Sequence, residues 1–121
     1  MANTLNMCQP ITLLYLDIVN TKEYNKFMQF EWDEKKNILN QKKHDVSFEE
    51  AKEVFSDALQ ISKLDHRFNY FEERWITIGA TKKYQILVVA NLFFSEEGEE
   101  IIRIISARKA NNNERKIYEK C

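Results

Sequence analysis

Residue types that bind an anion and move a proton occur in two groups in this sequence. Within segment 33–44, four polar residues fall in an arc of about 100° if the chain is helical: Lys36, Asn40, Lys43 and His44. A histidine suits proton transfer near neutral pH. The alternative is a solvated helix face whose histidine caps the C-terminal end, and spacing alone leaves both interpretations open.

The second group consists of three arginines on predicted strands. Arg103 lies between pairs of isoleucines in IIRII, Arg74 opens RWITIG, and Arg108 ends IIRIISAR. A guanidinium in the middle of a strand needs a partner or a ligand, and its planar donor fork matches phosphate oxygens. The alternative is intramolecular pairing with one of three acids: Glu31, Glu72 or Glu73.

Two further side chains allow both functional and structural interpretations. Trp32 could stack on a nucleobase, but an aromatic residue beside a strand–helix junction usually belongs to the core. His66 lies in KLDHRFNYFEE, which is predicted to be a loop. There the pattern does not separate a functional role from a structural one.

Helix-start signals organise the first part of the chain. The stretch QFEW at 29–32 is a strand candidate. Asp33 follows it as an N-cap, and a helix is predicted from there to about Lys43. Ile38 and Leu39 are expected to form the apolar side of this helix.

Two capping boxes predict two further helices. Ser47 with Glu50 opens the first, and Asn111 with Glu114 opens a short basic helix to about Lys120. Behind the first box, apolar residues recur at helical spacing: Phe48, Ala51, Val54, Phe55 and Ala58.

Between these helices the sequence predicts strands. Residues 73–79, 84–94 and 101–107 are strand candidates, and residues 95–100 are predicted to form a hairpin loop. The order predicts an α+β fold, with N-terminal helices packed on a small antiparallel sheet followed by a C-terminal helix.

Composition narrows the classes of function. The 121 residues include 44% hydrophobic residues, enough for one core. Residues 101–121 contain six basic and two acidic residues (+4), whereas residues 31–60 contain five lysines and eight acids (−3), which favours a local anion site. The sequence has only two glycines, which excludes a glycine-rich phosphate loop. Cys8 and Cys121 predict neither a disulfide framework nor a metal site, so a reduced, cytoplasmic protein is expected.

The first 27 residues differ from this pattern. Their apolar run is interrupted by Asp17, is shorter than the ~20 residues of a membrane span, and lacks the features of a signal peptide. Residues 1–27 are therefore interpreted as an extension, and residues 28–121 as the domain. Met28 is a candidate start, which a mass measurement of the native N-terminus would test.

Three stretches of the chain resemble the BrnT family of bacterial toxins. They read FEWDEKKNILNQKKHDVSFEEAKEVFSD, EERWITIG and IIRIISARKANNNERKIYE, in the order and spacing of the family. The resemblance covers about 28–119, roughly three quarters of the chain. BrnT proteins are the toxins of type II toxin–antitoxin pairs, so the resemblance implies a RelE-like ribonuclease fold.

The resemblance also implies an activity and partners. It implies an endoribonuclease that cleaves RNA without metal or cofactor and inhibits translation. It further implies a BrnA-like antitoxin with a ribbon-helix-helix domain, and an operator DNA contacted only through the complex, which autoregulates its operon. No membrane contact is expected.

The family pattern matches residues singled out above. In the first block the matching positions are Trp32, Asp33, Lys36, Asn40, Lys43 and His44, with Phe48 and Glu49 as structural positions. In the later motifs they are Arg74, Arg103, Arg108, Arg115 and Tyr118.

These matches lead to a hypothesis of metal-free cleavage, in which the RNA 2′-hydroxyl is the nucleophile. Arg74 and Arg103 would hold the phosphate with Arg108 as a third donor, and His44 or Lys43 would exchange the proton. RNA binding would use Trp32, Lys36 and Asn40.

The chain departs from the family pattern at two places, and the second departure favours an alternative. Arg67 follows His66 where a His-Ser pair is usual, and acids occupy the end of the central strand where a basic residue is usual. The alternative is a catalytically weak or inactive binding module that acts only as a co-repressor with the antitoxin.

Overall fold

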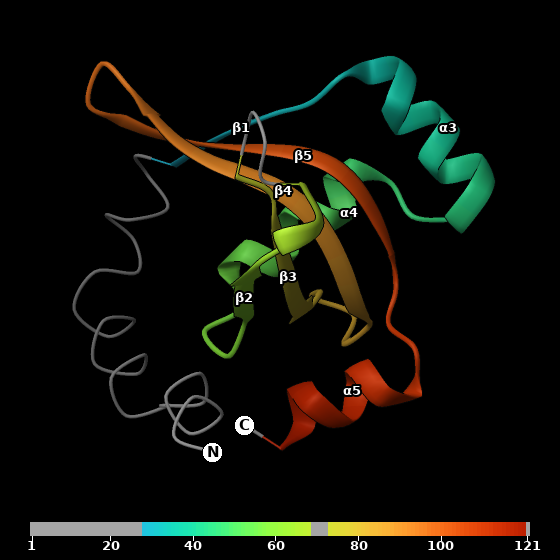
Figure 1. Cartoon of the computed structure of the whole chain (residues 1–121). Helices are drawn as coiled ribbons and strands as arrows, with labels where there is room; N and C mark the ends of the chain where they lie inside the picture. The colour runs from blue at the N-terminus through green and yellow to red at the C-terminus, as the bar shows by residue number, and fades with distance from the viewer. Residues whose placement is uncertain (1–27, 69–72, 121) are drawn as a thin grey trace.

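The computed structural model describes residues 28–68 and 73–120. Its strands are β1 (Met28–Glu31), β2 (Ile61–Leu64), β3 (Trp75–Ala80), β4 (Ile86–Glu96) and β5 (Glu99–Lys109). Its helices are α3 (Glu34–His44), α4 (Phe48–Lys52) and α5 (Asn112–Glu119), with short 3-10 helices η1 (Glu53–Ser56) and η2 (His66–Phe68) (Figure 1). The α+β prediction is confirmed. The proposed extension at 1–27 and the candidate acid Glu72 lie outside the described residues.

The five strands form one sheet in the order β1-β5-β4-β3-β2. The pairs β2–β3, β3–β4 and β4–β5 are antiparallel, but β1 pairs with β5 in parallel. The expectation of an antiparallel sheet is therefore wrong at this edge, and the sheet is mixed. No hairpin joins β1 to β5, so the long connection between them allows either strand direction.

Several element boundaries also differ from the prediction. Most of the expected loop at 95–100 belongs to β4 and β5, which meet at a turn of Glu97 and Gly98, both with positive φ. β2 was not predicted, because its four residues are too few to show a clear alternation. The second helix ends at Lys52 and continues as η1, which leaves Ala58 in a turn.

The core lies between the sheet and the layer formed by α4 and η1, which is behind the strands in Figure 1. Phe48 and Val54 of this layer are fully buried. Gly79 of β3 allows the close approach, because a Cβ there would lie 2.7 Å from Val54 Cγ1. The core residues that the sheet contributes are Met28, Leu87, Val89, Ile102, Ile104 and Ala107.

α3 is attached to the sheet by an amide. Asn40 is 7% exposed and donates to the carbonyls of Val46 and Ala107, both at 2.8 Å. Its amide oxygen accepts the Ala107 N–H at 3.1 Å. Because β1 pairs with β5 only as far as Arg103, Asn40 satisfies β5 backbone groups that have no neighbouring strand on that side.

The second buried residue of α3 is also an asparagine. Asn37 accepts the backbone N–H of Phe48 at 2.9 Å and so links α3 to the start of α4. Ile38 and Leu39 are 48% and 63% exposed. The apolar side of the helix is therefore not the side that packs on the sheet, because hydrogen bonds and not apolar contacts fix its rotation.

A β-bulge in β5 determines which side chains face away from the core. The register shifts between Ala90 and Asn91, and Ile105 is the extra residue on β5. Strict alternation would place Arg103 and Arg108, five residues apart, on opposite faces. With the bulge, both lie on the face opposite α4, because the buried residues around them are Ile102, Ile104 and Ala107.

Candidate anion-binding pocket

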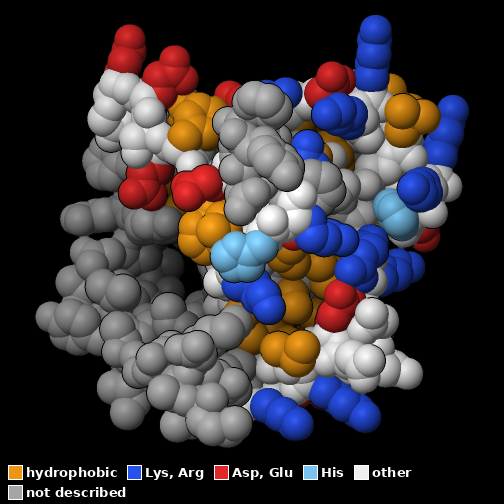
Figure 2. Space-filling view, viewed as in Figure 1, with side chains coloured by type: hydrophobic (Ala, Val, Ile, Leu, Met, Phe, Trp, Pro, Cys, Tyr) orange, Lys and Arg blue, Asp and Glu red, His pale blue; other side chains and the backbone are white. Residues whose placement is uncertain are grey.

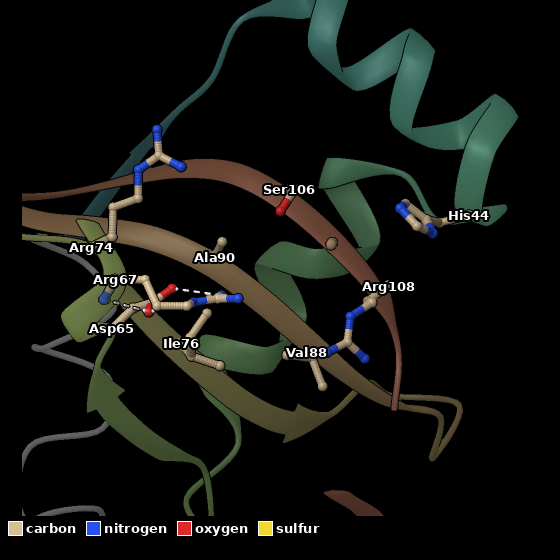
Figure 3. Close-up of a pocket in the computed structure, with 10 residues that line it drawn as sticks. His44, Asp65, Arg67, Arg74, Ile76, Val88, Ala90, Ser106 and Arg108 are labelled. Atoms are coloured by element: carbon tan, nitrogen blue, oxygen red, sulfur yellow. Dashed lines mark hydrogen bonds and ion pairs between the residues drawn. The ribbon is translucent and has the colours of Figure 1, made fainter. Parts of the chain in front are cut away.

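The sheet face opposite α4 carries an open pocket of about 340 Å³. Figure 2 shows basic side chains around apolar surface on this side, whereas acidic side chains gather over the β4–β5 hairpin. The floor of the pocket is formed by Ile76, Val88, Ala90, Ser106 and Ala107. Its walls carry the ionisable side chains His44, Asp65, Arg67, Arg74 and Arg108 (Figure 3).

Arg108 reaches the pocket from the end of β5, where Glu114 of α5 holds it. Nη1 and Nη2 of Arg108 each donate to one carboxylate oxygen of Glu114, at 2.8 Å in both cases. These hydrogen bonds lower the pKa of Glu114 from its ordinary value. Glu114 also accepts the Asn111 N–H at 2.9 Å in the predicted capping box. One carboxylate therefore serves both the helix cap and the pocket arginine.

A second carboxylate holds the other end of α5. The Tyr118 hydroxyl donates to Asp57 Oδ2 at 2.5 Å, and the same oxygen accepts the Ala80 N–H at 2.8 Å. Burial, and then the hydrogen bond to Asp57, raise the pKa of Tyr118. None of the residues of α5 is buried, so these polar contacts are prominent among those that position the helix.

Arg67 is held by Asp65 in the segment that follows β2. Nε and Nη2 of Arg67 donate to the two Asp65 oxygens, each at 2.9 Å, and these bonds lower the pKa of Asp65. The side chain of Asp65 is 8% exposed, whereas that of Arg67 is 75% exposed. The carboxylate is therefore an anchor within the structure, and the guanidinium extends from it over the pocket.

His44 is brought to the pocket by the end of α3. The helix stops there because Asp45 has a left-handed backbone conformation, with φ 59°. Asn40 ties the preceding turn to β5, so the imidazole lies at the edge of the pocket near Ser106 and Arg108 (Figure 3).

Three of the five predicted catalytic residues line this pocket: His44, Arg74 and Arg108. Arg103 is not among the lining residues, because its Nη1 donates to Glu31 Oε2 at 2.7 Å beside β1. This is one of the intramolecular pairs that the sequence left open. Lys43 is exposed and is also not a lining residue.

The residues predicted to bind RNA do not share one surface. Lys36 is exposed on α3, whereas the buried amide of Asn40 is fully engaged with the backbone. Trp32 packs edge-on against Phe48, with ring centroids 6.0 Å apart, and its Nε1 donates to Glu34 at 3.2 Å. Asn40 and Trp32 therefore have structural roles in this fold.

The sequence did not identify four side chains at or beside the pocket: Asp65, Arg67, Ser106 and Glu114. The spacing Asp-x-Arg at 65–67 was a usable signal for an ion pair, and Glu114 was recognised only as a helix cap. The bulge in β5 places Ser106 on this face, and no local sequence pattern predicts that bulge.

The arrangement combines donors for an anion with a group that can exchange a proton. Three guanidiniums and one imidazole surround a floor without charge, where electrostatic attraction is less screened than in bulk water.

Among the described residues, no group of three or more His, Cys, Asp or Glu side chains is placed to hold a metal ion. No helix in the described part of the chain is long and apolar enough to cross a membrane.

The comparison with protein families agrees with the resemblance seen in the motifs. A family model described as "Ribonuclease toxin, BrnT, of type II toxin-antitoxin system" matches residues 32–114. A crystal structure of the ribonuclease toxin BrnT from Brucella abortus has 26% sequence identity and a TM-score of 0.47, covering 70% of this chain and 99% of that chain. The comparison with curated proteins gives no match.

Proposed function

Because this chain belongs to the BrnT family of ribonuclease toxins of type II toxin–antitoxin systems, we propose that its pocket cleaves RNA. The observation that carries the proposal is the meeting of His44, Arg74 and Arg108 in one pocket. These residues come from three separate segments of the chain, and each belongs to one of the motifs that resemble the family.

In the proposed reaction the RNA supplies its own nucleophile. The 2′-hydroxyl attacks the adjacent phosphorus, the bond to the 5′-oxygen breaks, and a cyclic phosphate and a 5′-hydroxyl remain. Arg108 stabilises the charge that develops on the phosphate, Arg74 adds positive charge from another part of the pocket lining, and His44 exchanges the proton. Lys43 and Arg103 are not needed in this scheme, since neither lines the pocket.

The wider setting follows from the family and is part of the proposal. We propose a RelE-like fold, inhibition of translation in the cytoplasm, and neutralisation by a BrnA-like ribbon-helix-helix antitoxin. The complex would repress its own operon, with DNA contact through the antitoxin. Residues 28–121 would form the toxin domain.

The test is cleavage of a labelled single-stranded RNA by purified protein in EDTA. We expect cleavage with cyclic-phosphate ends. Arg108→Ala should reduce the rate ~10²–10³-fold, the usual cost of removing one transition-state donor. Lys83→Ala removes an exposed charge outside the pocket lining and should cleave normally. Normal cleavage by a folded Arg108→Ala variant would refute the assignment of the site.

One observation favours the alternative of an inactive co-repressor. Glu114 and Asp65 already bind two of the three pocket arginines, which reduces the net positive charge offered to RNA. Growth after induction without the antitoxin separates the two functions. A ribonuclease toxin arrests growth, and the arrest is relieved by Arg108→Ala, whereas an inactive module is tolerated.

A further inference from the structure

The two carboxylate-bound arginines of the pocket use different edges of their guanidinium groups. Asp65 accepts hydrogen bonds from Nε and Nη2 of Arg67, which form the side edge of that guanidinium. Glu114 accepts hydrogen bonds from Nη1 and Nη2 of Arg108, which form the end of that guanidinium. Each bidentate pair fixes the plane of a guanidinium, which a single hydrogen bond would not do.

Arg108 keeps part of its guanidinium available for a ligand. Of its five N–H groups, Glu114 takes two, and the Lys109 carbonyl lies 3.4 Å from Nη1. Within the described residues, Nε–H and the second hydrogen of Nη2 have no further hydrogen-bond partner. These two donors are parallel and form the side fork, whose spacing matches two oxygens of one phosphate.

The two guanidiniums lie on the same pocket. In Figure 3 the Arg67 side chain extends over Ile76 toward the part of the pocket that Arg108 lines, whereas Arg74 points away from both. Hydrogen bonds to Glu114 raise the pKa of Arg108, and the charge of Arg67 acts in the opposite direction. The two positive groups line the same uncharged floor, and their charges repel each other. A bound anion would relieve that repulsion.

We propose that Arg67 and Arg108 together clamp one phosphate of the single-stranded RNA backbone, with Asp65 and Glu114 as the positioning residues. This arginine clamp rests on the proposed function, but it adds a substrate contact at Arg67. The BrnT resemblance does not supply that contact, because a His-Ser pair is usual in this loop of the family. The clamp thus gives this chain a cationic group that its acidic β4–β5 hairpin does not offer.

Binding is tested apart from cleavage with a single-stranded 2′-O-methyl RNA, which lacks the nucleophile. Affinity is measured by fluorescence anisotropy over a range of salt concentrations. Arg67→Ser should weaken binding about 10- to 100-fold, the value of a charged hydrogen bond. It should also reduce the slope of log K against log salt by about 0.7, the contribution of one phosphate contact. Lys83→Ser is the charge-matched control and should change neither quantity.

Arg67→Lys keeps the charge but not the planar donor fork. The clamp predicts an affinity between those of the wild type and Arg67→Ser, with the salt slope preserved. Because the Arg67 side chain is 75% exposed, both variants are expected to fold, which thermal unfolding verifies. An unchanged affinity and salt slope in folded Arg67→Ser would overturn the clamp.

Substitution of the carboxylates distinguishes a positioning role from simple charge neutralisation, because the two roles predict different effects on RNA affinity and on kcat. Glu114→Gln keeps a side-chain oxygen for the capping box, and Asp65→Asn keeps the shape of its side chain. If the carboxylates only neutralise, removing one should tighten RNA binding and leave kcat unchanged. If they position the arginines, kcat should fall several-fold without a compensating fall in KM, and Glu96→Gln on the hairpin should have no effect.

The outcomes separate the clamp from the proposed function. If the wild type binds the 2′-O-methyl RNA through Arg67 but cleaves no RNA, the clamp stands and the ribonuclease proposal fails. If the wild type cleaves RNA and Arg67→Ser binds and cleaves equally well, the clamp fails and the ribonuclease proposal stands. If the wild type does not bind the 2′-O-methyl RNA at all, the clamp is also refuted.

Discussion

The neighbouring helices α3 and α4 lie against the same sheet but are held in different ways. α4 buries Phe48 and Ala51 completely in the apolar core. α3 buries only two polar residues, Asn37 and Asn40, and leaves Ile38 and Leu39 exposed. α4 is therefore held mainly by burial of apolar surface, and α3 mainly by hydrogen bonds that fix one rotation about its axis.

This difference matters for the pocket. An apolar contact tolerates small rotations, whereas the three hydrogen bonds of Asn40 do not. His44 follows Asn40 by four residues and lies on nearly the same side of the helix. The amide attachment thus positions the imidazole relative to Arg108, while α4 supplies stability on the other face of the sheet.

The largest effect is expected on α4. Phe48→Ala should destabilise the protein by about 3–5 kcal/mol, because it removes a fully buried ring and leaves a cavity. Urea unfolding followed by fluorescence measures the loss. Glu49→Ala, at the exposed next residue, is the control and should change stability little. A loss below about 1 kcal/mol for Phe48→Ala would show that the core collapses around the gap.

A smaller loss with a functional consequence is expected on α3. Asn40→Ala leaves buried backbone groups of Val46 and Ala107 unpaired, each at a cost of about 1–3 kcal/mol if water cannot replace the amide. We also expect the NMR signals of the His44 ring to shift and cleavage to slow. Asn113→Ala, at an exposed asparagine of α5, should leave all three quantities unchanged. Unaltered His44 signals in Asn40→Ala would contradict the positioning role.

The two helices should respond alike when their N-caps are removed. Asp33 caps α3 and Ser47 caps α4, each through a side-chain oxygen that accepts a backbone N–H. Asp33→Ala and Ser47→Ala should each cost about 0.5–2 kcal/mol in urea unfolding. A cost for one cap alone would mean that the helices differ in local stability as well as in packing.

The smallest effect is expected at the exposed apolar residues of α3. Leu39→Ser should change the free energy of unfolding by no more than about 0.5 kcal/mol, because the side chain is 63% exposed. A destabilisation above about 1 kcal/mol would mean that Leu39 is covered in solution, contrary to the structure.

Features that depend on neighbouring residues were predicted from the sequence, whereas features that depend on contacts between distant segments were not. The caps at Asp33, Ser47 and Asn111 were predicted correctly, because capping involves residues within one turn. The rotation of α3 could not be predicted, because hydrophobic periodicity does not detect amide hydrogen bonds to a residue 67 positions away in the sequence. β2 was missed because its pairing with β3 is supplied by the partner strand.

The pocket shows the same limit. Arg74, Arg108 and His44 were singled out by their motifs, but their meeting depends on the sheet register and on the tie between Asn40 and β5. Arg103 has the same motif support, and the structure pairs it with Glu31 of β1. The parallel pairing of β1 that sets Glu31 opposite Arg103 is not visible in either segment alone.

The sequence by itself determined the α+β class, the helix starts and the family, because these depend on local patterns and motif order. Only the tertiary structure decided which arginines share a pocket and which carboxylates hold them. The bulge at Ile105 put Arg108 on the open face, and the packing of α5 brought Glu114 to it. Such choices depend on register and on contacts between distant segments, where one residue of shift moves a side chain to the other face of the sheet.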